Sequence, residues 1–155
     1  MRLIWEMTTY LVQHGEAYSE EEDPERRLTP KGRRETERIA RYLYSINTSV
    51  EKIFHSPKRR AKETAEIIAK YLGGELVEDE NLKPLDAPDK WVEKILDIDY
   101  DIMLVGHLPH LSRLASTLLN TSEDIIRFRY SSVLSLDREG RKWLVKWFIT
   151  PEIIP

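Results

Sequence analysis

The chain has 155 residues, the length of one domain with a substantial hydrophobic core, and its net charge of −3 with 33% charged residues lacks the basic excess of a general nucleic-acid-binding protein. It has no cysteine, which excludes disulfides, thiolate chemistry and cysteine zinc sites. Because the sequence contains no transmembrane run and no secretory signal, we expect a cytoplasmic location and no membrane partner.

The first predicted strand covers Thr9 to Val12, which are β-branched, aromatic and aliphatic residues. Residues 1–6 precede it, and we expect them to be a non-essential extension, with Met7 as an alternative start. The strand runs into Gln13-His14-Gly15, where glycine permits a sharp bend that brings other groups close to the imidazole. His14 is therefore expected at the carboxyl end of a strand, where ligands gather in open α/β sheets.

The next segments alternate between loops, helices and strands. An acidic loop is expected at 19–25, a helix from the cap Thr29-Pro30 to about Tyr44, a strand at 52–55, and a helix from a second cap, Ser56-Pro57, to about Leu72. Further along we expect a strand at 75–77, a loop bracketed by Pro84 and Pro88, a helix at 89–96, a strand at 102–105 and a helix at 111–119. Two final strands at 132–136 and 143–149, joined by a turn at 137–140, would add antiparallel pairing to a mainly parallel sheet.

Three of these strands deliver basic side chains to what is expected to be one edge of the sheet. His14 follows the first strand, Arg60 follows the strand at 52–55, and His107 follows the strand at 102–105. Two imidazoles beside a guanidinium suit a phosphoryl group, because one imidazole can attack phosphorus while the other groups bind and neutralise its oxygens. The competing interpretation of Arg60 is a basic helix face shared with Lys58 and Lys62.

Four motifs resemble those of the histidine phosphatase superfamily, and most closely its SixA-type phosphohistidine phosphatases. They are Val12-Gln13-His14-Gly15-Glu16-Ala17, Arg26-Arg27-Leu28-Thr29-Pro30-Lys31-Gly32, Ser56-Pro57 with Arg60-Ala61 and Thr64-Ala65, and Gly106-His107-Leu108-Pro109. They follow the order of the family and cover most of the chain. The resemblance implies a single α/β domain with the phosphoglycerate-mutase-like fold: a three-layer α/β/α sandwich whose mainly parallel central sheet carries an antiparallel C-terminal strand.

The resemblance also implies a phosphatase that needs no metal and no other cofactor. His14 would attack phosphorus and become transiently phosphorylated, and water would then release phosphate. Arg60 would clamp the phosphoryl oxygens, and His107, as an imidazolium, would add a second positive donor. A zinc site built from His14, Glu16, His107 and His110 is the alternative, but these residues lack the spacing of known zinc motifs.

The chain departs from the family signature at Gln13, where relatives carry an arginine that grips the phosphoryl oxygens. A glutamine amide donates a hydrogen bond without charge, and losing one charge-assisted contact costs roughly 1.5–3 kcal/mol of phosphate binding. By resemblance, Arg26 or Arg27 lies near the site, and the register favours Arg26 as the substitute. A solvated loop arginine is the competing interpretation.

No motif identifies a general acid for an ester leaving group, although Glu80, Asp86 and Asp89 flank the proline-bracketed loop. SixA-type relatives are similarly short, and a protonated phosphohistidine leaves well without a dedicated acid. We therefore expect a phosphorylated protein, carrying phosphohistidine, as the substrate. A small phosphate ester, or a catalytically weak domain that binds a phosphorylated ligand, are the alternatives.

The two remaining histidines carry no predicted role in the reaction. His110 follows the last motif, and we expect it on the surface of the helix that begins there. His55 precedes the motif serine, and we expect it to pack or to cap.

Overall fold

The computed structural model describes residues 7–155, so the predicted extension at residues 1–6 lies outside the described part. One six-stranded sheet has the order β3-β2-β4-β1-β5-β6. The strands are β1 (Thr8–Gln13), β2 (Lys52–His55), β3 (Glu75–Glu78), β4 (Ile102–Gly106), β5 (Val133–Glu139) and β6 (Lys142–Ile149). The pairs β1/β4, β2/β4 and β2/β3 are parallel, whereas β5 runs antiparallel to both β1 and β6.

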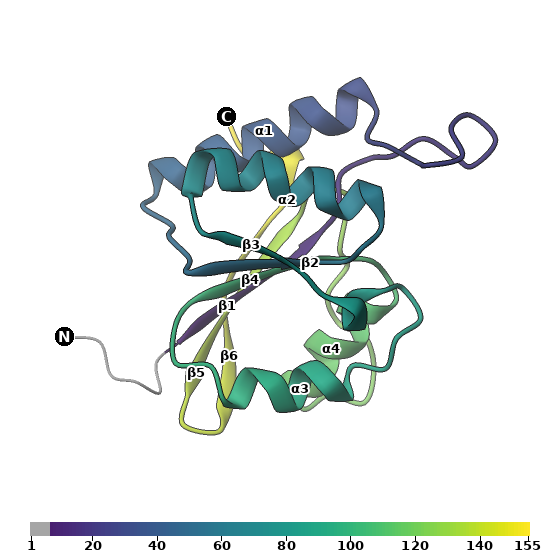
Figure 1. Ribbon diagram of the computed structural model, residues 1–155. Helices are drawn as coiled ribbons and strands as arrows, with labels where there is room; N and C mark the ends of the chain where they lie inside the picture. The colour runs from purple at the N-terminus through teal and green to yellow at the C-terminus, as the bar shows by residue number, and fades with distance from the viewer. Residues whose placement is uncertain (1–6) are drawn as a thin grey trace.

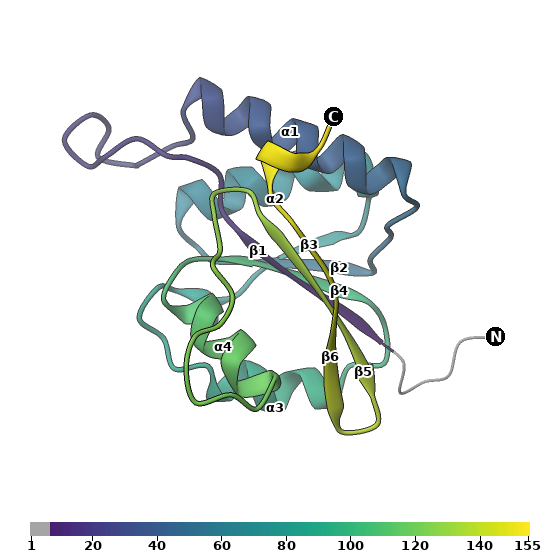
Figure 2. The same ribbon diagram turned by 180° about the vertical axis from the view of Figure 1, so that it is seen from behind.

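Helices cover both faces of the sheet (Figures 1 and 2). On one face lie α1 (Pro30–Ser45) and α2 (Arg59–Leu72), and on the other lie α3 (Asp89–Leu96) and α4 (His110–Leu118). Two short 3₁₀ helices, Glu80–Leu82 and Pro151–Ile153, were not predicted. The three-layer α/β/α sandwich with a mainly parallel sheet is thus confirmed. None of the helices within residues 7–155 is long and apolar enough to cross a membrane.

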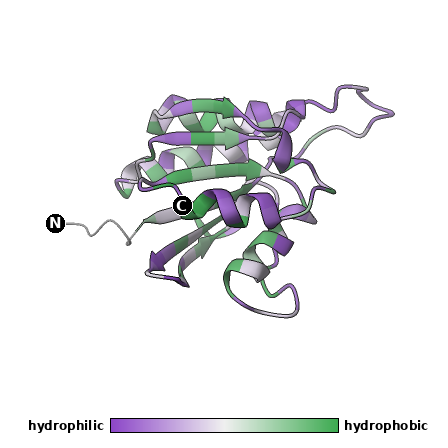
Figure 3. Ribbon diagram, turned by 60° about the horizontal axis from the view of Figure 1, so that its bottom comes forward, coloured by the Kyte–Doolittle hydropathy of each residue, from purple (hydrophilic) through white to green (hydrophobic). Residues whose placement is uncertain are grey.

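The central strands are apolar because both of their faces are buried. In β1, Tyr10 and Val12 pack in the cluster beneath α1 and α2, whereas Leu11 packs in the cluster with α3 and α4. In β4, Met103 and Leu104 are divided between the same two clusters. Figure 3 shows the hydrophobic strands between helices that carry polar residues on their outer sides. Burial on both faces is typical of parallel strands and explains their continuous apolar runs.

Two local predictions need correction. Helix α1 begins as expected, with the Thr29 hydroxyl accepting a hydrogen bond from the Gly32 N–H, but α2 begins later than the Ser56-Pro57 signal suggests, at Arg59. Its N-cap is Lys58, and the Ser56 hydroxyl instead accepts from the Lys58 N–H at 3.2 Å and contacts His107.

The final turn also differs from the prediction, because β5 continues through Glu139 and the chain turns at Gly140. Pairing with β1 extends the strand: Asp137 lies opposite Thr8, and the Arg138 N–H donates to the carbonyl of Met7. These contacts connect segments far apart in sequence, so the polar residues that predict a turn locally are held in the sheet.

The topology brings four chain segments to one edge of the sheet. The parallel strands β1, β2 and β4 all end there, with Gln13 opposite Gly106 and His55 opposite Val105. Since β5 is antiparallel and places Val133 opposite Val12, its beginning lies at the same edge. The loop between β1 and α1 projects from this edge as well (Figures 1 and 2).

Candidate active site

His14 is held at the end of β1 by its own backbone and by the next residue. Its N–H donates to the carbonyl of Gly106 at 3.0 Å, and its ring Nδ1 lies 2.7 Å from the carbonyl oxygen of Gly15. Because a carbonyl only accepts, Nδ1 carries the proton and Nε2 keeps its lone pair. A neutral imidazole with a free Nε2 is the form that attacks phosphorus.

Gly15 permits this arrangement because its Cα is closely surrounded. A Cβ at this position would lie 2.7 Å from the Thr36 hydroxyl oxygen and 3.2 Å from the Ser131 hydroxyl oxygen. The Gly15 N–H donates to the Thr64 hydroxyl at 2.9 Å, and that hydroxyl donates to the carbonyl of Arg60. The first turn of α2 is thereby connected to the backbone beside His14.

The structure brings His107 next to His14. The two ring centroids are 5.0 Å apart, and His107 Nε2 lies 2.8 Å from the Ser56 hydroxyl oxygen. His107 is buried, and its Nδ1 has no hydrogen-bond partner among residues 7–155. The ends of β1 and β4 thus supply two imidazoles to one small volume, and Ser56, which follows β2, contacts one of them.

Both imidazoles are neutral in the empty site. Burial lowers the pKa of His14 from 6.5 to about 4, the hydrogen bond to Gly15 opposes this shift, and the charges of Arg60 and Arg26 add to it. Burial lowers the pKa of His107 to about 2, assisted by His14 and Arg60. Burial first, and the neighbouring positive charges second, thus favour the neutral form of His107 in the protein alone, and the imidazolium expected beside a phosphoryl group stays a prediction.

Arg60 lies in the first turn of α2, half-buried, with its Nε lacking a hydrogen-bond partner among the described residues. Burial lowers its pKa, as does the charge of Arg26, whereas Tyr130 and Glu20 raise it. The effect of the Arg26 charge on Arg60 indicates that the two guanidinium groups lie near each other. An oxyanion between them would relieve their repulsion and complete their hydrogen bonding.

Arg26 and Arg27 differ in what they contact. Arg26 has a left-handed backbone with φ of +51°, its Nε donates to the carbonyl of Tyr18 at 2.9 Å, and its charge acts on His14 and Arg60. Arg27 instead pairs with Asp23 and lies over the Tyr18 ring. The structure therefore places Arg26, rather than Arg27, beside the two other basic groups.

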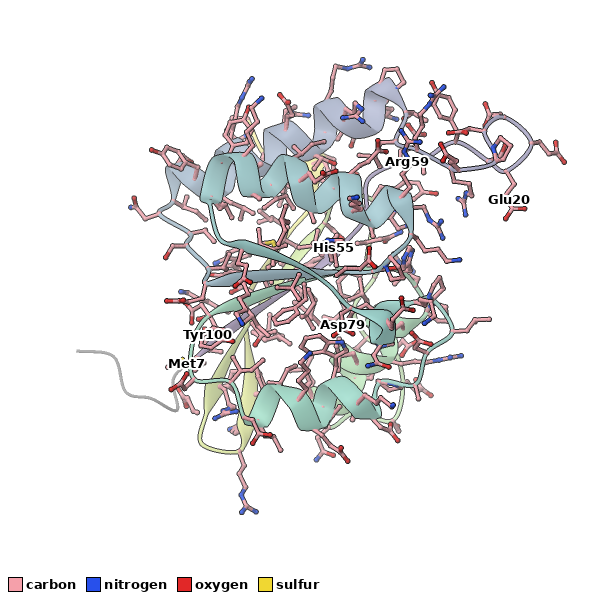
Figure 4. The ribbon with its side chains drawn as sticks, in the orientation of Figure 1. Met7, Glu20, His55, Arg59, Asp79 and Tyr100 are labelled. Carbon is pink, nitrogen blue, oxygen red and sulfur yellow. The ribbon has the colours of Figure 1, made fainter. Side chains whose placement is uncertain are left out.

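The loop that carries Arg26 is fastened to α2 through the buried carboxylate of Glu63. That carboxylate accepts from the Leu28 N–H at 2.8 Å and from Arg33 at 2.7 Å. Arg59 pairs with both Glu63 and Glu25. Figure 4 shows Arg59 at the base of the loop that carries Glu20. This network fixes the loop against the helix that also carries Arg60.

Gln13 is the last residue of β1 and is buried. Its Oε1 has no hydrogen-bond partner within residues 7–155. A buried amide oxygen without a hydrogen-bond partner costs about 1–3 kcal/mol of stability. Hydrogen bonding of this oxygen within the fold therefore does not explain why a glutamine stands here.

The three carboxylates considered as general acids lie elsewhere. Glu80 and Asp86 pair with Lys83, and Asp89 begins α3. None of the three is among the groups whose charge acts on His14, Arg60 or His107. The carboxylate that does act on Arg60 is Glu20 of the acidic loop, which sequence reasoning missed because loop positions carry no periodic signal.

Tyr130, just before β5, is the second residue that was missed, and its ring centroid lies 5.7 Å from that of His14. Only the antiparallel pairing of β5 brings it to this edge.

The other two histidines are both buried. His55 packs at the end of β2, with Nδ1 2.9 Å from the carbonyl oxygen of Ser56 (Figure 4). The surface position expected for His110 is wrong: the side chain is fully enclosed, and neither ring nitrogen has a hydrogen-bond partner among the described residues. The cause is tertiary, because its N–H donates to the carbonyl of Pro84, which places the proline-bracketed loop over the start of α4. Within residues 7–155, no group of three or more His, Asp or Glu side chains has the arrangement of a metal site.

The neutral imidazole pair predicts a measurable pH dependence. We expect the ring resonances of His14 and His107 to show no titration between pH 5 and 8 in the unliganded protein, as measured by NMR. Because an unfolded histidine titrates near 6.5, the unfolded chain binds protons that the folded chain excludes, so the free energy of unfolding falls as the pH falls from about 6.5 towards 4. A His14 resonance that titrates near pH 6.5 would contradict the desolvation argument.

Comparison with known proteins identifies the family. The model of the histidine phosphatase superfamily (branch 1) matches residues 9–94. An uncharacterized protein of Picosynechococcus sp. is 35% identical over 120 residues, covering 72% of this chain and 73% of that protein. The 5''-phosphoribostamycin phosphatase of Niallia circulans is 34% identical over 92 residues, covering 57% of this chain and 43% of that enzyme.

Among solved structures, the protein histidine phosphatase SixA complexed with tungstate superimposes with a TM-score of 0.84 at 22% identity, covering 94% of this chain and 97% of SixA. This similarity shows the shared fold. The match of the family model over more than half of the residues, together with the 35% identical relative, establishes that the chain belongs to branch 1 of the histidine phosphatase superfamily.

Proposed function

We propose that this protein is a metal-independent phosphatase that works through a phosphohistidine intermediate on His14. The observation that carries the proposal is the hydrogen bond from His14 Nδ1 to the Gly15 carbonyl, which leaves Nε2 unprotonated beside Arg60 and His107. A nucleophile with a fixed tautomer and a neighbouring cationic group are the two requirements for phosphoryl transfer without a metal.

In the first step, the lone pair of His14 Nε2 attacks phosphorus while the bond from phosphorus to the leaving group breaks, and the leaving group departs with its electron pair. Arg60 and Arg26 neutralise the phosphoryl oxygens throughout the transfer. In the second step, a water oxygen attacks the phosphorus, one water proton passes to a phosphoryl oxygen, and the bond from phosphorus to His14 breaks so that Nε2 recovers its lone pair. Phosphate is released.

His107 has a role that depends on the ligand. It is neutral in the empty site, but a phosphoryl dianion beside it favours the protonated form. Its Nε2, which contacts the Ser56 hydroxyl in the empty site, can then donate to a phosphoryl oxygen. Substrate binding would therefore bring a proton into the site, and this proton stays close to the phosphoryl group during transfer.

Protein phosphohistidine is the substrate that we favour. The carboxylates considered as general acids do not act on the basic residues of the site, and a phosphohistidine whose imidazole is protonated leaves without such an acid. The similarity to SixA supports the same substrate. The partner would be a phosphorylated protein, and the expected cytoplasmic location stays a prediction.

Two specific observations favour other functions. Similarity to a 5''-phosphoribostamycin phosphatase favours a small phosphate ester as the substrate. For such an ester, Glu20 would be the carboxylate to consider as general acid, because its charge acts on Arg60. The uncharged Gln13 favours a domain that binds a phosphorylated ligand and turns it over slowly.

The nucleophile can be tested directly by comparing wild type with His14→Ala. With EDTA present, we expect wild type to release phosphate from a phosphohistidine protein faster than from p-nitrophenyl phosphate, and the variant to show only background release. Rapid quenching of wild type should trap a phosphoryl group that is stable in base and labile in acid. A variant that keeps its activity would exclude His14 as the nucleophile.

The two loop arginines form a matched pair for testing the compensating charge. We expect Arg26→Ala to lower kcat/KM by about 10-fold or more, because a charge-assisted contact to the phosphoryl oxygens is lost. Arg27→Ala removes an ion pair with Asp23 and a contact with the Tyr18 ring, neither of which involves the basic residues of the site, so kcat/KM should stay within about twofold. Equal effects of the two substitutions would show that Arg26 has no special position.

Gln13→Arg distinguishes an attenuated enzyme from one adapted to glutamine. Restoring a guanidinium at the end of β1 should raise kcat/KM by about 10-fold or more, provided that thermal unfolding shows an intact fold. No gain in a folded variant would mean that the site has adapted to the uncharged amide. Wild type that binds tungstate but hydrolyses neither substrate would favour the ligand-binding alternative.

A further inference from the structure

Tyr130 presents an aromatic ring beside the proposed nucleophile without belonging to the hydrophobic core. Its ring centroid lies 5.7 Å from that of His14, with 42° between the ring planes, and 45% of the residue is exposed. Its phenol group acts electrostatically on Arg60. The ring thus reaches from the imidazole towards the guanidinium and has a large open surface at the mouth of the site.

The position of Tyr130 is fixed by the backbone that carries the nucleophile. The next residue, Ser131, has a φ of +62°, a conformation that serine adopts only where its surroundings impose it. Its N–H lies 3.0 Å from the carbonyl oxygen of Gln13 and 3.3 Å from that of His14, and its hydroxyl contacts that of Thr36. These buried contacts hold the Tyr130 backbone in register with His14.

The direction of phosphoryl transfer explains what the ring can contact. Since attacking and leaving atoms lie roughly in line, the leaving group departs on the side of phosphorus opposite to His14 Nε2. Because Nδ1 is hydrogen-bonded to the Gly15 carbonyl, this line starts from Nε2, on the other side of the imidazole ring. A ring that flanks His14 and is exposed at the mouth borders this path.

We propose that Tyr130 forms one wall of a leaving-group subsite that selects planar leaving groups, the imidazole ring of a phosphohistidine above all. This inference rests on the proposed phosphatase function and specifies its substrate class. A planar ring gains stacking contact with the tyrosine, and a protonated imidazole gains a cation–π attraction as well. An ammonia or short alkyl leaving group gains neither.

The experiment compares two substrates that share a phosphorus–nitrogen bond: phosphohistidine, with a ring, and phosphoramidate, without one. We expect Tyr130→Leu to lower kcat/KM for phosphohistidine by about 3- to 10-fold more than for phosphoramidate. Tyr130→Phe, which keeps the ring, should keep the ratio of kcat/KM between the two substrates within about twofold of the wild-type ratio. For each variant, the loss of kcat/KM on phosphohistidine is divided by the loss on phosphoramidate. This ratio does not depend on the intrinsic reactivity of the two substrates.

Three outcomes would overturn the proposal. Equal losses on both substrates would mean that Tyr130 serves the phosphoryl group or the position of His14, and no loss on either would mean that it contacts neither. Losses in Tyr130→Phe as large as in Tyr130→Leu would assign the effect to the hydroxyl group. Thermal unfolding of both variants checks that the half-exposed site tolerates the substitutions.

A binding measurement separates this proposal from the proposed function. Calorimetry would compare the binding of phenylphosphonate and methylphosphonate. We expect the preference for phenylphosphonate to be about 3- to 10-fold greater in wild type than in Tyr130→Leu. If wild type fails to hydrolyse phosphohistidine but shows this ring preference, the substrate assignment fails and the subsite stands. If it hydrolyses phosphohistidine but the preference for the ring is as large in Tyr130→Leu as in wild type, the phosphatase stands and the subsite is wrong.

Discussion

The hydrogen bond between His14 Nδ1 and the Gly15 carbonyl is the contact on which the site depends, because it decides which ring nitrogen faces the ligand. Gly15 itself lies in a space too small for a Cβ. Thr64 and Thr36, from α2 and α1, line that space. The orientation of one imidazole is therefore set jointly by β1 and by the two helices packed over it.

The electrostatics of the site follow from the same burial. Two neutral imidazoles and two arginines share a small region, where Arg26 acts on Arg60 and both arginines act on His14. Such a cluster is unfavourable when empty and becomes favourable around a phosphoryl dianion, which neutralises the guanidinium groups and supports protonation of His107. Glu63 holds the loop that carries Arg26 against α2, and under the proposed function this tertiary network supplies the charge that β1 lacks at Gln13.

Sequence periodicity predicted the layers well because the local patterns agree with the tertiary structure. Asp89–Leu96 forms the helix that was expected, and the Thr29-Pro30 cap begins α1 as expected. The errors lie where contacts distant in sequence dominate: pairing with β1 extends β5, and the loop at Pro84 encloses His110. Motif spacing was sufficient to predict that His14, Arg60 and His107 lie at one edge of the sheet, although their roles in the reaction stay predictions.

Tyr130 illustrates why sequence predicts the residues that act on phosphorus better than the residues that select the substrate. The residues proposed to act on phosphorus follow strands or begin helices, and those positions leave clear local signals. Tyr130 reaches the same edge only because β5 runs antiparallel to β1, with Ser131 bonded to the carbonyls of Gln13 and His14. A tyrosine before a strand has no local signature of this placement. Under the proposed mechanism the leaving group departs towards the mouth of the site, where segments that connect helices and strands supply the contacts. Related chains can exchange residues in these connecting segments while the phosphoryl site stays the same.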